Sequence, residues 1–214
     1  YHKSISQYIE SKLKLFEMTK DFILLNSQSK KIKNKIKNTD AKKLIYKETD
    51  SPCGFNGTSV QIDLFEKLAL IFKINSKKKI ASAASSVKPV VGRFNIIKGR
   101  NNQVIIIDYA HTPSSLIRVC KKAIKRRSFS NKNNKLIIVF GCGGDRDKSK
   151  RKEMGSIACK YASHTIITDD NPRSENPKTI TREICSVFGE KNSFEVINDR
   201  KKAIRRSIQL TSEN

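Results

Sequence analysis

The chain has 214 residues, enough for one complete domain and part of a second. Hydrophobic residues make up 37% of it, and no apolar run approaches the roughly 20 residues that a bilayer-spanning helix needs, so a soluble, cytosolic protein is expected. The 44 Lys and Arg residues outnumber the 20 Asp and Glu residues, and the formal net charge of +24 would attract polyanions.

The basic residues are mostly Lys mixed with Asn and Ile, as in KKIKNKIKN, with few aromatic residues nearby. Because nucleic acids are usually bound by stacked aromatic rings or a clustered basic face, this spread favours a compositional bias, and a nucleic-acid-binding module is the alternative. The five cysteines form no CxxC pair, so neither a zinc site nor a disulfide framework is predicted. The first residues, YHKSISQYIE, lack a secretory signal and begin without Met, which we interpret as the start of an internal fragment.

The first 90 residues contain few regular patterns. Apolar residues at three- and four-residue steps predict a helix over 4–18, namely Ile5, Tyr8, Ile9, Leu13 and Phe16. Lys12 falls on this stripe, where it could lay its stem along apolar neighbours with its amine in water, or have a functional role. Beyond it we expect a strand over 22–26, a Lys-rich stretch, a turn at SPCGFNGTS, a helix over about 63–73 and a basic loop.

From Asn95 onward, short β-branched runs alternate with helical patterns. The expected strands are VIII at 104–107, LIIVF at 136–140, TIIT at 165–168 and FEVI at 194–197. The apolar faces of three helices lie between them and begin at Leu116, Met154 and Ile180. This rhythm predicts βαβ units in a Rossmann-like α/β domain, with a mainly parallel sheet and helices on both faces.

Three polar loops follow three of these strands: DYAHTP at 108–113, GCGGDRDKSKR at 141–151 and DDNPRSENP at 169–177. Because the carboxyl ends of parallel strands meet at one edge of a sheet, we expect the loops to form a functional cleft. Asp108 could accept hydrogen bonds from ribose hydroxyls, and His111 could pack on a base, although a lone DxxH could equally cap the next helix.

The second and third loops carry groups suited to carboxylates. Gly141, Gly143 and Gly144 let the backbone approach a ligand, and Arg146 suits a carboxylate or phosphate. Asn171 and Arg173, on a turn stiffened by Pro172, suit a zwitterionic amino acid, although Asp-Asn-Pro-Arg could be only a helix-entry turn. The chain contains no GxxxxGK[ST] phosphate-binding loop.

The ordered motifs VVGRF, IIIDYAHTP, VFGCGGDRDKSKR, ITDDNPRSENP and NDRKKAI resemble the C-terminal domain of the Mur ligases, over about residues 88–211. Within that family they resemble the type that adds meso-diaminopimelate. The first helix resembles a central-domain segment of the family. The resemblance implies a partial central, ATP-binding domain over residues 1–90 and a C-terminal domain, truncated at its end, over 91–214.

The resemblance also implies roles for single residues. Arg93, Asp108 and His111 would contact ATP. Arg146 and the run Asp170, Asn171, Pro172 and Arg173 would recognise meso-diaminopimelate, because the arginine is absent from the corresponding loop of lysine-adding ligases. Lys12 matches a lysine that is carbamylated and helps hold Mg²⁺.

The implied reaction is an ATP-dependent amide ligation in peptidoglycan synthesis. It joins meso-diaminopimelate to UDP-N-acetylmuramoyl-L-alanyl-D-glutamate through an acyl phosphate, in the cytoplasm, by a monomer that binds neither nucleic acid nor membrane. The phosphate-binding loop and the UDP-binding domain would precede Tyr1, and a Gly and a Glu of the diaminopimelate pocket would follow Asn214. Several dozen residues of the family are missing between Lys47 and Gln61, and Asp63 stands where Asn is common. We therefore expect a fragment that is inactive alone, and a non-catalytic relic is a further alternative.

Overall fold

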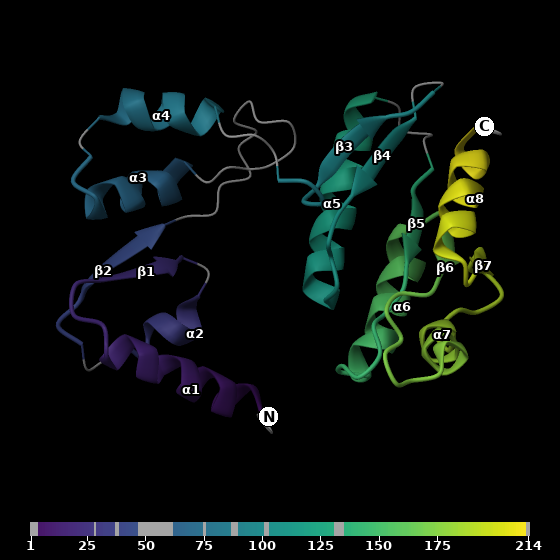
Figure 1. Ribbon diagram of the computed structural model, residues 1–214, viewed down its shortest axis with the longest axis horizontal. Coiled ribbons are helices and arrows are strands. Elements are labelled where there is room, and N and C mark those ends of the chain that lie inside the picture. The colour runs from purple at the N-terminus through teal and green to yellow at the C-terminus, as the bar shows by residue number, and fades with distance from the viewer. Residues whose placement is uncertain are drawn as a thin grey trace. The chain divides into compact units, whose positions relative to one another are not determined.

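The computed structural model describes residues 4–27, 29–36, 39–46, 62–74, 76–86, 90–100, 103–130 and 135–212. The chain forms two compact units, Tyr1–Val91 and Gly92–Asn214 (Figure 1). No helix among the described residues is long and apolar enough to cross a membrane.

The first unit contains a small parallel sheet and several helices. Its elements are α1 (Ile5–Glu17), β1 (Phe22–Asn26), α2 (Lys30–Lys33), β2 (Lys42–Tyr46), α3 (Ile62–Ile71) and α4 (Lys77–Ser86). Helix α1 begins where the Ser4 side chain accepts a hydrogen bond from the backbone N–H of Gln7. The predicted helices over 4–18 and 63–73 and the strand over 22–26 are present, whereas the turn expected at 51–59 lies outside the described residues.

Three elements of this unit, α2, β2 and α4, were not predicted, and α2 has only four residues. Strand β2 lies in the Lys-rich stretch, where Lys43 projects from the strand and its Nζ donates to the Ile36 carbonyl at 2.9 Å. Helix α4 lies where a basic loop was expected, because its alanines favour a helix without giving an apolar stripe. Neither β2 nor α4 has the periodicity on which a sequence-based assignment depends.

The core of the first unit is formed by Ile23, Leu25, Ile36 and Ala41. Leu13 and Phe16 of α1 pack against this core, but Ile5 and Tyr8, on the same stripe, are 76% and 49% exposed. The stripe predicted for α1 is therefore only partly buried, and Lys12 is exposed.

The second unit alternates strands and helices along the chain. Its elements are β3 (Asn95–Lys98), β4 (Val104–Ile107), α5 (Pro113–Ser130), β5 (Ile137–Phe140), α6 (Ser149–Tyr161), β6 (His164–Ile167), α7 (Pro177–Cys185), β7 (Phe194–Val196) and α8 (Arg200–Ser212). The four predicted strands lie within one residue of β4, β5, β6 and β7. Helix α8 was not predicted, because its fully buried apolar residue is only the small Ala203.

A parallel sheet with the order β5-β6-β7 forms the centre of this unit. Neighbouring residues of β6 point to opposite faces, and both Ile166 and Ile167 are fully buried. Ile167 belongs to the core that includes Leu116 of α5, Met154 of α6 and Ile180 of α7. Helix α8 contacts β5 and β6, and the completely buried Ile166 and Ala203 lie outside that core. Helices therefore cover both faces, and the predicted α/β class is confirmed.

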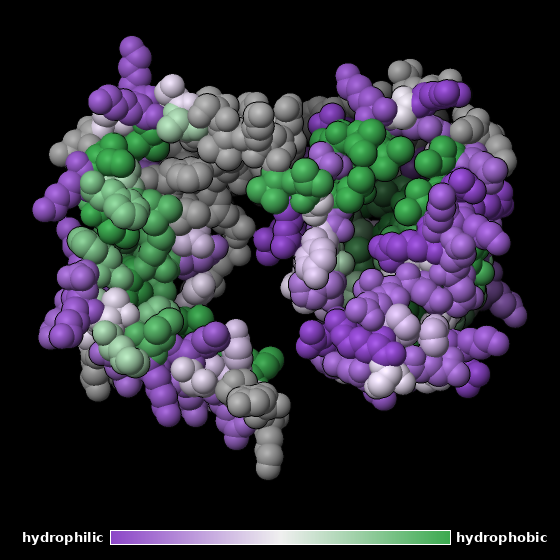
Figure 2. Space-filling view, in the orientation of Figure 1, coloured by the Kyte–Doolittle hydropathy of each residue, from purple (hydrophilic) through white to green (hydrophobic). Residues whose placement is uncertain are grey.

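The position of β4 corrects one expectation. Strand β4 does not belong to the parallel sheet but pairs antiparallel with β3, Asn95 lying opposite Ile107. Only five residues separate the two strands, which is too short for a helical crossover, so the chain folds back as a hairpin. Ile97, Val104 and Ile107 of this hairpin are 43%, 50% and 44% exposed, and apolar surface is visible over β3 and β4 in Figure 2.

Candidate functional site

The first loop brings together the three residues for which a nucleotide role was predicted. Asp108, at the end of β4, accepts a hydrogen bond from the backbone N–H of Phe94 at 2.7 Å through its Oδ2 atom. This bond fixes the segment that carries Arg93, where Phe94 has a positive φ of 47°. The Oδ1 atom of Asp108 has no hydrogen bond to any residue that the structure describes.

Tyr109, which was not predicted to be a site residue, contacts both Arg93 and His111. The Arg93 guanidinium carbon lies 5.0 Å from the centre of the Tyr109 ring, and Tyr109 meets the His111 ring edge-on at a centroid distance of 5.2 Å. Nδ1 of His111 lies 3.1 Å from the Tyr109 carbonyl oxygen. Tyr109 is 65% exposed. Arg93 and the first loop therefore present a cation and two aromatic rings to solvent.

The second and third loops are held together by their backbones. The Gly144 N–H donates to the Asn171 carbonyl at 2.9 Å. A Cβ atom at Gly144 would collide with the Pro172 carbonyl oxygen, and one at Gly141 would collide with the Thr168 carbonyl oxygen. Gly141 and Gly144 are thus required by the close approach of the neighbouring loop.

Arg173 is held in one orientation. Its φ is 50°, its backbone N–H donates to Oδ1 of Asn171 at 3.2 Å, and its Nη1 donates to the Gly144 carbonyl at 2.6 Å. Ser174 then binds the Asp145 carboxylate through both its backbone N–H and its hydroxyl, at 3.1 and 2.7 Å. These two hydrogen bonds lower the pKa of Asp145.

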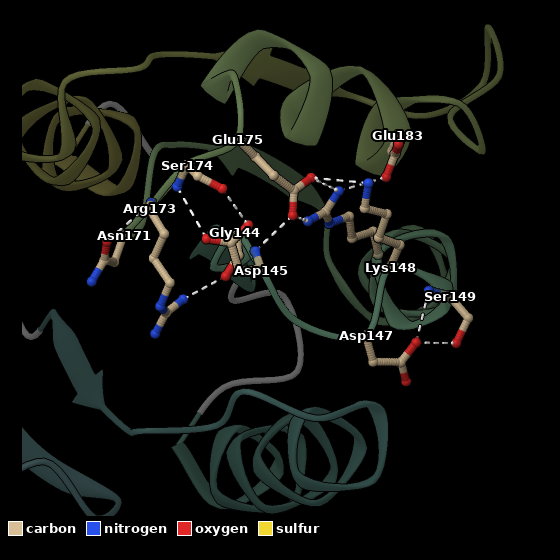
Figure 3. Close-up of polar contacts among 11 residues, drawn as sticks. Gly144, Asp145, Asp147, Lys148, Ser149, Asn171, Arg173, Ser174, Glu175 and Glu183 are labelled. Atoms are coloured by element: carbon tan, nitrogen blue, oxygen red, sulfur yellow. Dashed lines mark hydrogen bonds and ion pairs between the residues drawn. The ribbon is translucent and has the colours of Figure 1, made fainter. Parts of the chain in front are cut away.

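A buried arginine also connects the second loop to the third. Arg151 of α6 is completely buried and donates to Glu175 through Nη1 and Nη2, at 2.9 and 2.8 Å, and to Glu183 at 2.8 Å (Figure 3). Glu175 also accepts from the backbone N–H of Asp145 at 2.7 Å. The hydrogen bonds from Arg151 are the main cause that lowers the pKa of Glu175 from 4.5 to about 2. We call Asp145, Arg151, Ser174, Glu175 and Glu183 the clamp.

The start of the third loop is anchored separately. Nδ2 of Asn198 donates to the Asp169 carboxylate at 2.8 Å, and Nη1 of Arg200 donates to the Asp169 carbonyl at 3.2 Å. In Figure 3 the Asn171 and Arg173 side chains lie to the left of Gly144 and Asp145, and the Glu175 carboxylate lies to their right. The third loop is therefore fixed at both ends, with its exposed polar side chains between the two anchors.

Among the described residues, some of the predicted site residues are joined by hydrogen bonds and others are not. The first loop contacts the second where Nζ of Lys150 donates to the His111 carbonyl at 3.1 Å. Among the described residues, no hydrogen bond or ion pair joins Asp108 to Arg146 or Arg173. Arg146 and Asp170 are exposed, and neither makes a hydrogen bond or ion pair within the described part of the chain. Lys12 belongs to the first unit.

Sequence reasoning missed Tyr109, Lys150 and the clamp. A signal for Arg151 existed, because it lies three and seven residues before Met154 and Ala158 and so continues the apolar face of α6. A charged residue on a buried face indicates an internal ion pair. No group of three His, Cys, Asp or Glu side chains in the described ranges could hold a metal ion.

The model of the Mur ligase family's glutamate ligase domain matches residues 92–214, which is more than half of the chain. The chain belongs to the Mur ligase family. A curated Mur ligase relative from Chlamydia felis, named UDP-N-acetylmuramoyl-L-alanyl-D-glutamate--2,6-diaminopimelate ligase, is 33% identical over 246 residues, covering 100% of this chain and 49% of that protein. A relative from Clostridium acetobutylicum with the same name, numbered 2, is 46% identical over 137 residues, covering 64% of this chain and 27% of that protein.

The chain spans about half the length of the Chlamydia felis relative. Among solved structures, the folylpolyglutamate synthase of Mycobacterium tuberculosis, complexed with ADP and AMPPCP, has a TM-score of 0.72 at 12% identity. That match covers 100% of this chain and 54% of the synthase. This likeness shows that the chain shares the fold of the matched part of the synthase.

Proposed function

We propose that this chain is part of an ATP-dependent, cytoplasmic ligase that adds meso-diaminopimelate to UDP-N-acetylmuramoyl-L-alanyl-D-glutamate and acts as a monomer. Residues 1–90 are proposed to belong to its central domain and residues 91–214 to its C-terminal domain. The family match over residues 92–214 and the names of the relatives support this proposal.

The observation that carries the proposal is the fixed position of Arg173. One guanidinium nitrogen is bound to Gly144, which leaves Nη2 and Nε without a partner among the described residues. The Asn171 amide is similarly oriented, because its oxygen already accepts from Arg173 N–H, so its NH₂ group can donate to a ligand. A planar donor pair held this way suits a carboxylate, and the exposed Asp170 suits the adjacent ammonium group of an amino acid. Pro172 stiffens the turn between them, and Arg146 offers a second cation.

The first loop fits a nucleotide. Oδ1 of Asp108 is available to accept from a ribose hydroxyl, the Tyr109 and His111 rings can pack against a base, and Arg93 adds a positive charge. ATP would supply the phosphoryl group that activates the carboxylate of the acceptor as an acyl phosphate. The residues of the first loop would only bind and orient the nucleotide.

Lys12 is proposed to help hold Mg²⁺ as a carbamate. Its amine is exposed and lies 5.5 Å from the centre of the Tyr8 ring, so it is accessible to carbon dioxide. The carbamate would present oxygen atoms, which are the ligands that Mg²⁺ prefers. The metal ion would offset the charge of the phosphoryl group during transfer.

The proposal can be tested by titrating meso-diaminopimelate into the ¹⁵N-labelled 214-residue chain and following backbone amide shifts by NMR. We expect saturable shifts in the third loop and weaker binding of L-lysine, which lacks the second carboxylate. Loss of a hydrogen bond to a charged group costs roughly 1.5–3 kcal/mol, so Arg173→Ala should raise the dissociation constant by about tenfold or more.

Arg205→Ala is the matched control, because Arg205 is an exposed arginine of α8 and its loss changes the net charge equally. The control should bind like the parent chain. Equal affinity for L-lysine and meso-diaminopimelate, or an unchanged affinity in Arg173→Ala, would overturn the assignment of the third loop.

A further inference from the structure

The first turn of α6 contacts both loops that carry the proposed binding groups. Consecutive helix residues project about 100° apart, so the side chains of Lys150 and Arg151 diverge. Arg151 turns into the protein and binds Glu175 of the third loop. Lys150 turns the other way, and its Nζ donates to the His111 carbonyl at 3.1 Å. Two neighbouring residues thus connect the second loop to the third and to the first.

The His111 carbonyl lies between the start of α5 and the Tyr109–His111 ring pair, so a hydrogen bond to it can position the first loop. Immediately after it, Thr112 begins the entry to α5 through reciprocal hydrogen bonds with Ser115: Thr112 N–H donates to the Ser115 hydroxyl at 3.0 Å, and Ser115 N–H donates to Oγ1 of Thr112 at 3.3 Å. Immediately before it, the His111 ring packs against the ring of Tyr109. The loop is therefore fixed by α5 on the C-terminal side of His111. On the N-terminal side, Arg93 contacts the Tyr109 ring and Asp108 binds the Phe94 N–H, and Lys150 holds the peptide that carries the His111 ring.

We infer that Lys150 is a positioning residue that holds the Tyr109–His111 ring pair in place for the base or ribose of a nucleotide. This inference rests on the proposed function, since it assigns the ring pair to nucleotide binding. Lys150 acts through the His111 carbonyl, without need of touching the nucleotide itself. Its ammonium has three donors and suits this task, because a charged donor makes a stronger hydrogen bond to a carbonyl than a neutral one.

The contact is tested first without any ligand. In Lys150→Met, which keeps the apolar stem, we expect the ¹H–¹³C resonances of the Tyr109 and His111 rings to move, because the mutual shielding of two adjacent rings depends on their geometry. The control is Lys152→Met, in which an exposed lysine two residues further along α6 is lost with the same change in charge. Ring resonances that respond equally in the two variants, or in neither, would overturn the positioning role.

The functional consequence is tested by titrating ADP into the same proteins under NMR observation. Loss of a hydrogen bond from a charged, partly exposed donor predicts an ADP dissociation constant about five- to tenfold higher in Lys150→Met. Lys152→Met should bind within about twofold of the parent chain, and Lys150→Arg should restore binding, because a guanidinium can also donate to the His111 carbonyl.

A merely structural effect would weaken both proposed sites together. The shifts that meso-diaminopimelate causes in the third loop should therefore stay unchanged in Lys150→Met. If the parent chain binds ADP and Lys150→Met binds it equally well, the inference about Lys150 is wrong while the proposed function stands. If ADP leaves the Tyr109 and His111 resonances of the parent chain unmoved, the nucleotide assignment fails, and the role inferred for Lys150 fails with it.

Discussion

Replacement of Arg151 by Met should destabilise the second unit more than any change of an exposed arginine. Removing one partner of a buried ion pair typically costs about 3–5 kcal/mol. The lower end is expected here, because the side chains of Glu175 and Glu183 are 13% and 32% exposed and can become hydrated once the guanidinium is gone. Nε of Arg151 is also buried without a hydrogen-bond partner among the described residues, so removing it offsets part of the loss in stability. We therefore expect a loss of about 3 kcal/mol, or roughly 6–12 °C in Tm.

The loss can be measured for the second unit alone by urea-dependent thiol labelling, with the labelled sites located by mass spectrometry. Cys120 and Cys142 are buried in the core of that unit, and burial raises the pKa of Cys120 to about 11 and also raises that of Cys142. Both thiols therefore react slowly until the unit unfolds. Arg205→Met is the control. Equal urea midpoints for Arg151→Met and Arg205→Met would refute the view that the clamp stabilises this unit.

Two further predictions concern the clamp and the loop contact. Because the pKa of Glu175 is about 2 in the folded protein and about 4.5 otherwise, its ionised form stabilises the fold fully above pH 4.5. The urea midpoint should fall as the pH is lowered from 4.5 to 2, and this fall should be smaller in Glu175→Gln; an identical fall in the variant would contradict the assignment. Gly144→Ala should cost about 1–3 kcal/mol, because its Cβ collides with the Pro172 carbonyl. Gly189→Ala, whose Cβ would meet no atom nearer than 4.0 Å, should cost less in the same urea assay, and equal costs would argue against the collision.

Local patterns predicted the elements of the second unit except β3 and α8, but they did not predict how every strand pairs. The strands at β5, β6 and β7 could be located because β-branched runs alternate there with helical stripes. The pairing of β4 with β3 could not be predicted. A four-residue strand carries no information on which strand it pairs with, and β3 was not recognised as a strand.

For the candidate site, the position of the loops could be predicted from the sequence, but the pairing of their side chains could not. The second and third loops were expected at one edge of the sheet, and they are in contact there. Their mutual bonds involve Asp145 with Ser174 and Arg151 with Glu175, pairs that are 29 and 24 residues apart. Such pairing depends on backbone positions that the sequence does not display, such as the positive φ of Asp145 and Arg173. Arg151 also stands in the run KSKRKE, where one buried charge cannot be distinguished by composition from its exposed neighbours.

Because the third loop is anchored on both sides of residues 170–173, these four residues can be substituted without loss of either anchor. Asp169 before it is secured by Asn198 and Arg200, and Glu175 after it is secured by Arg151, without the help of the four residues' side chains. Under the proposed function, libraries that vary only these four positions should alter which amino acid is bound while the scaffold keeps its shape. A designer seeking a new specificity would leave both anchors intact and retain a residue that tolerates the left-handed backbone at position 173.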